Sequence, residues 1–201
     1  VSLPCIRIDA VAGGAESAAG AAPQADAIVI TSRRSAEMLD GVIDPSVPVI
    51  AVGPETAAAV EEAGGTVALV GSGGVRQLAR DAGQILEGKD VVLVGASNTV
   101  RQSAAALEMA GCSVTAIELY TTVPIAPPDD PVDAVTFGSP TAVTGWLIAR
   151  EFTDLTVAAI GATTAASLRG HGIEPDVVAD QPGFINMIEQ LAALRLERST
   201  S

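Results

Sequence analysis

Short apolar runs alternate along the chain with longer segments in which apolar residues recur every three or four positions. The run at 27–31 is followed by a segment of helical spacing that begins at Ser32, a residue suited to cap a helix. The run at 47–52 ends at Gly53, and Pro54 then fits the first position of a helix, where its missing N–H costs no hydrogen bond. We expect two more strand-helix pairs, with strands at 66–70 and 89–95 and helices at 75–86 and 99–111.

The second half of the chain repeats this pattern. Strand-helix pairs are expected within 133–150, 155–172 and 175–194. When the two halves are aligned, Ser32 meets Ser139 and, after one insertion, Gly53 meets Gly161. A single insertion across three consecutive pairs is hard to obtain from composition alone. We therefore interpret the pattern as an internal repeat.

Four stretches lie outside the repeated pairs. The segments at 1–11 and 113–124 have the character of extended strands. The stretches beside them, 12–24 and 125–131, are rich in Gly and Ala or in Pro, and we interpret them as linkers. The chain is therefore expected to cross twice between two domains through a hinge of two extended strands.

The internal repeat and the two extended segments predict two similar domains, one at 25–112 and one at 131–196. Runs of Val, Ile, Leu and Ala between Ala-rich helical segments are typical of parallel strands covered by helices on both faces, which predicts an α/β fold. Trp146 and Phe184 are expected in the core of the second domain. The first domain has a fourth strand-helix pair without a counterpart in the second, so we expect the chain to lack one such unit before Val1.

The charge balance narrows the classes of partner. Lys and Arg number 11 against 24 Asp and Glu, a formal net charge of -13, which argues against nucleic acid or an anionic membrane as a partner. The uncharged runs fall short of a membrane span, so we expect a cytoplasmic protein. Cys5 and Cys112 lie in apolar segments and are expected to be buried free thiols. One His and two distant Cys cannot assemble a metal cluster, so no metal is expected.

The candidate ligand-binding residues lie where the predicted strands end and the helices begin. In an open parallel sheet these ends line one crevice, and helix N-termini present free N–H groups with a partial positive charge. Such corners suit an anionic or polar ligand, although each Ser or Thr there could equally serve only as a helix cap. No nucleophile-base pair or dinucleotide motif is visible. The hydroxyl residues and glycines at these corners are Thr31, Ser32, Gly53, Thr56, Ser139, Gly161, Thr163 and Thr164.

The order of these motifs resembles the uroporphyrinogen-III synthase family. The resemblance rests on the corners TS, VG-x-x-TA and FGSP to IGATTA, and on the extended segments LPCIRI and IELYTTVP. It implies two α/β domains with the linear tetrapyrrole hydroxymethylbilane in the cleft between them. Members of the family release the hydroxyl as water and close the macrocycle with inversion of ring D, without a cofactor. We therefore expect a monomer that makes at most transient contact with the preceding enzyme of the pathway.

Individual residues carry this resemblance. Tyr120 matches the family's hinge tyrosine, which would assist the loss of the hydroxyl, although a Tyr in a strand could also merely pack. Ser32 and Ser139 match the serines that follow their strands. Holding a folded substrate in place can itself lower a barrier by ~7–11 kcal/mol in favourable cases. The expected substrate-binding residues are Thr31, Ser32, Gly53, Thr56, Ser97, Arg101, Ser139, Gly161, Thr163 and Thr164.

Two departures from the family's pattern leave a second hypothesis open. Gly138 stands where a Thr commonly precedes the serine, and the unit expected before Val1 would carry one corner of the cleft. The leading hypothesis is a uroporphyrinogen-III synthase, favoured by Tyr120 and the corner threonines. The alternative is a catalytically silent two-domain binding or regulatory protein of the same fold.

Overall fold

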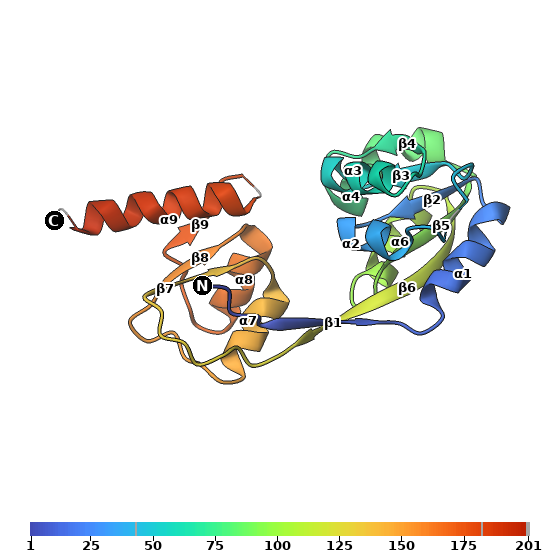
Figure 1. Ribbon diagram of the computed structural model, residues 1–201. Helices are drawn as coiled ribbons and strands as arrows, with labels where there is room; N and C mark the ends of the chain where they lie inside the picture. Colours follow the sequence, from blue (N-terminus) through green and yellow to red (C-terminus); the bar gives the residue numbers. More distant parts are fainter. Residues whose placement is uncertain (43, 182, 200–201) are drawn as a thin grey trace. The chain divides into compact units, whose positions relative to one another are not determined.

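The computed structural model describes residues 1–42, 44–181 and 183–199. The chain forms two compact units (Figure 1). Unit 1 comprises Val1–Arg7 and Val123–Ser201, and unit 2 comprises Ile8–Thr122. Each contains a parallel sheet flanked by helices, which confirms the predicted α/β class.

Unit 2 is built on a six-stranded sheet in the order β1-β6-β5-β2-β3-β4. The central strand β2 pairs in parallel with β3 and β5, and β4 and β6 extend the parallel part on either side. All four residues of β2 are buried, as is expected of a parallel strand with both faces covered. The strands are β1 (Ile6–Ala10), β2 (Ala27–Ile30), β3 (Val49–Ala51), β4 (Val67–Val70), β5 (Asp90–Ala96) and β6 (Ser113–Pro124).

Alternate residues of β2 point into two separate apolar layers. Ile28 and Ile30 pack with side chains of α1, α2 and α3 on one face of the sheet. Ala27 and Val29 pack with side chains of α4, α5 and α6 on the other face. The helices are α1 (Gly14–Ala21), the 3-10 helix η1 (Ala22–Gln24), α2 (Arg33–Met38), α3 (Pro54–Glu62), α4 (Gly74–Asp81), α5 (Gly83–Leu86) and α6 (Val100–Glu108).

The stretch at 12–24, predicted to be a linker, instead forms α1 and η1. Ala18 and Ala22 are fully buried in the apolar layer beneath these helices. Gly14 lies so close to β6 that a Cβ there would be 2.5 Å from the backbone oxygen of Glu118. The small residues therefore allow a helix to pack closely on the sheet, and the linker prediction was wrong.

Unit 1 contains a three-stranded parallel sheet in the order β7-β8-β9. Trp146 is fully buried, as predicted, and packs edge-to-face against Phe137 with ring centroids 5.9 Å apart. Phe184 was also predicted to be core, but it is 56% exposed at the start of α9. The elements are β7 (Ala134–Phe137), α7 (Pro140–Leu147), β8 (Thr156–Ala159), α8 (Ala162–Gly170), β9 (Val177–Val178) and α9 (Phe184–Ser199).

Neither a membrane helix nor a metal cluster is found in the part of the chain that the structure describes. No helix there is both long and apolar enough to cross a bilayer. No group of three His, Cys, Asp or Glu side chains gathers to hold a metal ion. Cys5 and Cys112 are buried free thiols, as predicted, and burial raises the pKa of both.

Candidate functional site

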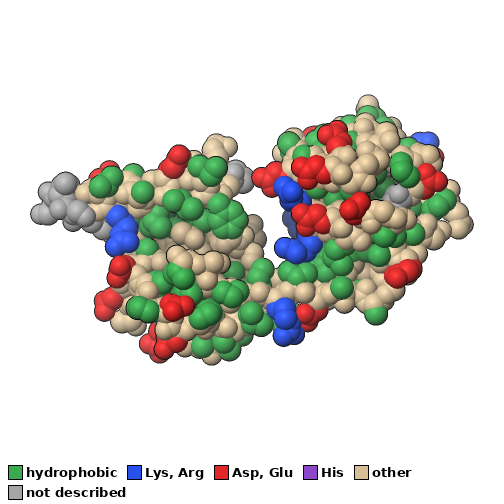
Figure 2. All heavy atoms as spheres, in the orientation of Figure 1, with side chains coloured by type: hydrophobic (Ala, Val, Ile, Leu, Met, Phe, Trp, Pro, Cys, Tyr) green, Lys and Arg blue, Asp and Glu red, His purple; other side chains and the backbone are tan. Residues whose placement is uncertain are grey.

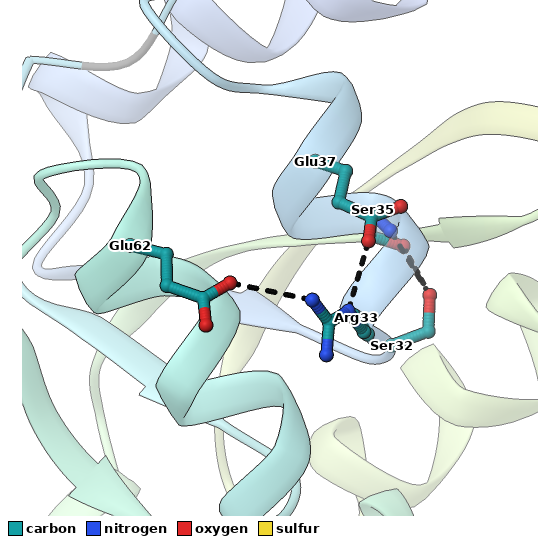
Figure 3. A network of polar contacts seen from close by, with 5 residues as sticks. All are labelled: Ser32, Arg33, Ser35, Glu37 and Glu62. Carbon is teal, nitrogen blue, oxygen red and sulfur yellow. Dashed lines mark hydrogen bonds and ion pairs between the residues drawn. The ribbon is translucent and has the colours of Figure 1, made fainter.

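The start of α2 lies beside Tyr120 of β6. Ser32 caps α2, because its Oγ accepts a hydrogen bond from the backbone N–H of Ser35 at 3.1 Å. The same Oγ is 2.9 Å from Ser35 Oγ and 3.2 Å from Tyr120 Oη. Figure 3 shows Ser32 and Ser35 facing each other at this helix terminus. Three hydroxyl groups thus form one hydrogen-bonded chain that joins a helix N-terminus to the only tyrosine of the protein.

The main chain of Tyr120 is fixed from the neighbouring strand-helix corner. The backbone N–H of Ser97, directly after β5, donates to the carbonyl oxygen of Tyr120 at 2.8 Å. Ser97 Oγ donates to the same oxygen at 3.2 Å and accepts from Thr121 Oγ1 at 3.0 Å. Tyr120 is 9% exposed. Its ring is therefore anchored at both the backbone and the hydroxyl.

Thr31 ties the end of β2 to β5. Its hydroxyl donates to the backbone oxygen of Val94 at 2.9 Å. A Cβ at Gly95 would be 2.5 Å from Thr31 Oγ1, so glycine is needed there for this contact. The Thr31 hydroxyl thus donates its proton within the sheet, so its oxygen can only accept a hydrogen bond from a ligand.

Gly53 and Gly161 build the same corner in the two units. Both are helix N-caps with extended backbone, at φ -171° and 171°, which any residue can adopt. A Cβ at either position would meet no atom within 4 Å. The fold therefore does not require glycine at these two positions, and the space beside each helix N-terminus is open.

The threonines of these corners differ in exposure. Thr56 and Thr164, three residues after the capping glycines, are 5% and 3% exposed. Thr163, one residue earlier in its helix, is exposed. The matched burial of Thr56 and Thr164 supports the internal repeat, but it places both side chains in the packed interior rather than on the open side of the corner.

Ser139 forms the unit 1 counterpart of the Ser32 corner. Its Oγ accepts from the backbone N–H of Ala142 at 3.2 Å, with a backbone conformation close to that of Ser32. Ser139 lines a groove of about 750 Å³ along β7. Gly138 lies under the ring of Phe184, since a Cβ there would be 2.6 Å from Phe184 Cζ. A larger residue at position 138 would therefore displace this exposed ring.

The basic side chains near the unit 2 corners are mostly paired. Arg33 contacts Glu37 at 2.9 Å and Glu62 at 3.3 Å (Figure 3), and these carboxylates raise the pKa of its guanidinium. Arg101 is 3.6 Å from Glu118. On the face visible in Figure 2, basic side chains are few and lie beside acidic ones. Among the described residues Arg34 makes no ion pair, so it is the basic group of this region most open to an anionic ligand.

The structure thus brings together one group of the predicted residues in unit 2, comprising Thr31, Ser32, Ser97 and Tyr120. Arg101 lies on α6, the helix that follows Ser97, while Gly53 and Thr56 belong to the corner between β3 and α3.

The sequence analysis missed two residues of this group, Ser35 and Thr121. A serine three residues after a capping serine was a usable signal for Ser35, because that position faces the cap. The predicted residues in unit 1 are Ser139, Gly161, Thr163 and Thr164.

Comparisons with known proteins identify the fold and the family of the chain. A family model described as uroporphyrinogen-III synthase HemD matches residues 1–189. A uroporphyrinogen-III synthetase from Helicobacter pylori is similar in structure, with a TM-score of 0.71 and 18% identity over 94% of this chain and 91% of that chain. A mutant uroporphyrinogen III synthase from Thermus thermophilus has a TM-score of 0.65 and 20% identity over 97% of this chain and 88% of that chain.

The wild-type Thermus enzyme has a TM-score of 0.57 and 19% identity over 97% of this chain and 87% of that chain. No curated protein sequence matches the chain. Structures at such identities establish the fold, whereas the family model extends over nearly the whole sequence. Because that match spans residues 1–189 of 201, the chain belongs to the uroporphyrinogen-III synthase family.

Proposed function

We propose that Tyr120 and the strand-helix corners of both units carry out the family's reaction in this chain. That reaction closes hydroxymethylbilane to uroporphyrinogen III with inversion of ring D and loss of water, which makes the protein a cyclising lyase of tetrapyrrole biosynthesis. The observation that supports the assignment of Tyr120 is its hydroxyl, held 3.2 Å from a serine at a helix N-terminus.

In this proposal Tyr120 donates a proton to the leaving hydroxyl of the substrate. The C–O bond breaks, water departs, and the electron-rich pyrrole supplies the electron pair that stabilises the cationic carbon until ring closure. The pyrrole carbon that forms the new C–C bond then loses a proton, which restores the Tyr120 hydroxyl. Proton donation by one positioned group typically contributes about 10²–10⁴-fold to a rate. Electrons pass to no external acceptor in these steps, so the proposal needs no redox cofactor.

The corners at Gly53 and Gly161 are proposed to hold carboxylates of the substrate. Free N–H groups at helix N-termini attract anions, and the open space at each glycine lets a ligand approach the backbone closely. A net charge of -13 opposes the approach of a polyanion, so local N–H groups and Arg34 must outweigh long-range repulsion. Added salt screens both effects and should change affinity only mildly, with a Debye length of about 8 Å at physiological ionic strength.

The remaining parts of the proposal concern the form in which the protein acts. Both sets of corners belong to one chain, which supports a monomeric enzyme. The acidic composition supports action in the cytoplasm rather than on an anionic membrane. Hydroxymethylbilane closes by itself to another isomer, so transient contact with the enzyme that supplies it would be useful.

The test is an assay of the product isomer. Hydroxymethylbilane is generated enzymatically in the presence of the protein, and the uroporphyrinogen isomers are separated after oxidation. We expect the type III isomer with the wild-type chain and about tenfold to a thousandfold slower formation with Tyr120→Phe, which removes one hydroxyl and keeps the ring. Only type I isomer with the wild-type chain would refute the proposal and support the catalytically silent alternative.

A further inference from the structure

The hydroxyl of Ser35 has a restricted choice of hydrogen-bond partners. Ser35 is fully buried at the third position of α2. Within the described part of the chain its Oγ meets a single partner, Ser32 Oγ at 2.9 Å. A buried hydroxyl proton without an acceptor is costly. The proton of Ser35 must therefore be donated to Ser32 Oγ.

This direction fixes the next hydrogen bond as well. A serine hydroxyl has two lone pairs and one proton. Ser32 Oγ already accepts from the backbone N–H of Ser35 at 3.1 Å, and the Ser35 hydroxyl fills its second lone pair. Ser32 Oγ can then only donate to Tyr120 Oη, 3.2 Å away. Tyr120 accepts this bond and keeps its own proton for another acceptor.

We propose that Ser35 is a positioning residue that sets the hydrogen-bond order, in which Ser35 donates to Ser32 and Ser32 donates to Tyr120. This order keeps the Tyr120 proton available for the leaving hydroxyl of the substrate. This inference rests on the proposed function. Without the Ser35 hydroxyl, Ser32 Oγ regains a free lone pair. Tyr120 can then donate to Ser32, which withdraws its proton from the substrate.

The internal repeat supplies a natural comparison. Ala142 occupies the position in unit 1 that Ser35 occupies in unit 2, and Ser139 caps its helix there with the same geometry as Ser32. The corner therefore folds without a hydroxyl at this position. Ser35→Ala should thus remove the hydrogen-bond order while leaving the helix cap intact, and Ser17→Ala, at an exposed serine of α1, is the control.

The kinetic test is a double-mutant cycle between positions 35 and 120. Ser35→Ala should lower the turnover number about two- to tenfold, the effect of one neutral hydrogen bond, with KM unchanged. In the Tyr120→Phe background the same change should have no further effect, because Ser35 acts only through the tyrosine hydroxyl. Ser17→Ala should retain wild-type turnover. An equal loss in both backgrounds, or wild-type turnover in Ser35→Ala, would overturn the inference.

A second readout follows the hydrogen-bond direction without substrate. The intensity ratio of the tyrosine ring doublet in the Raman spectrum distinguishes a phenol oxygen that accepts from one that donates, and Tyr120 is the only tyrosine. Tyr120→Phe supplies the blank. We expect an acceptor signature in the wild type and a shift towards the donor signature in Ser35→Ala. A donor signature in the wild type, or no shift in the variant, would overturn the inference.

The two proposals fail in different ways. A wild-type chain that forms only type I isomer would contradict the proposed function, and the Raman measurement would still test the hydrogen-bond order. If Ser35→Ala does not fold by thermal melting, Ser35→Cys replaces it. The thiol is a weaker donor than a hydroxyl, so the doublet should shift in the same direction but less. An unshifted doublet in that variant would also contradict the assigned order.

Discussion

Replacing the capping glycines Gly53 and Gly161 with serine should change protein stability and catalytic activity in opposite directions. Gly53→Ser and Gly161→Ser each place a side chain where a Cβ meets no atom within 4 Å, on backbone that any residue can adopt. Serine caps a helix better than glycine by a few tenths of a kcal/mol. Loss of glycine also restricts the unfolded chain, by about 0.4–1 kcal/mol. Each variant should therefore be as stable as the wild type or more stable by up to about 1 kcal/mol.

The effect on activity should have the opposite sign. If substrate carboxylates contact the free N–H groups of α3 and α8, the serine side chains occupy part of that space. We expect kcat/KM to fall about tenfold or more for each variant, which corresponds to about 1.4 kcal/mol of lost transition-state binding. Thermal melting and the type III isomer assay measure the two effects on the same samples.

The control for this experiment is Gly20→Ser. Gly20 also has open space at its Cβ, but it lies on the exposed side of α1. It should leave kcat/KM unchanged. Wild-type kcat/KM in Gly53→Ser and Gly161→Ser would show that the repeated glycines are only a remnant of the internal repeat, and that the substrate is held elsewhere.

Three further predictions concern stability and binding. Gly14→Ala should destabilise unit 2 by about 1–3 kcal/mol, since its Cβ would overlap the backbone of β6. Gly20→Ala in the same helix should instead stabilise unit 2 by about 0.5–1 kcal/mol. Equal urea midpoints for the two variants would contradict the close-packing argument. The backbone N–H of Asp90 and then Lys89 lower the pKa of Asp26, so its stabilising effect is present above the ordinary value of 3.8 and is lost as the pH falls. Asp26→Asn should thus be less stable than the wild type at pH ~7 and equal to it at pH ~2, and an unchanged difference would refute this. Because Thr56 and Thr164 are buried, Thr56→Val, Thr164→Val and the double variant should bind substrate within about twofold of the wild type, and weaker binding in a titration would place these hydroxyls in the site after all.

The sequence was a good guide wherever the signal was local. Apolar runs identified the strands. The cap Ser32 and the first-position proline Pro54 identified where α2 and α3 begin, because the signals for a helix start lie within one turn of it. It failed for the stretch at 12–24. Small residues serve both flexible linkers and closely packed helices, and only the position of β6, about a hundred residues later, decides between them.

The candidate site shows the same division. The residue types at the corners could be read from the sequence, but the burial of Thr56 and Thr164 depends on which side of a helix faces the sheet. The bond between Ser32 and Tyr120 joins elements that are distant in sequence, so spacing could not reveal it. Phe184 was misplaced because an apolar residue at the start of a helix can face either the core or solvent.

The way the chain enters and leaves unit 2 affects the order in which the protein can fold during translation. Ile8–Thr122 leaves the ribosome as one uninterrupted piece, whereas unit 1 needs residues from both ends of the chain. Leu3 and Cys5 pack in the same apolar cluster as Phe137 and Trp146, so they cannot be buried until these later residues have been synthesised. Once unit 2 has folded, adjacent strands β1 and β6 hold its two ends together, which shortens the loop that must close. Nascent chains should therefore acquire protease resistance in unit 2 first, and a destabilised unit 2 should delay the maturation of unit 1 even though unit 1 itself is unaltered.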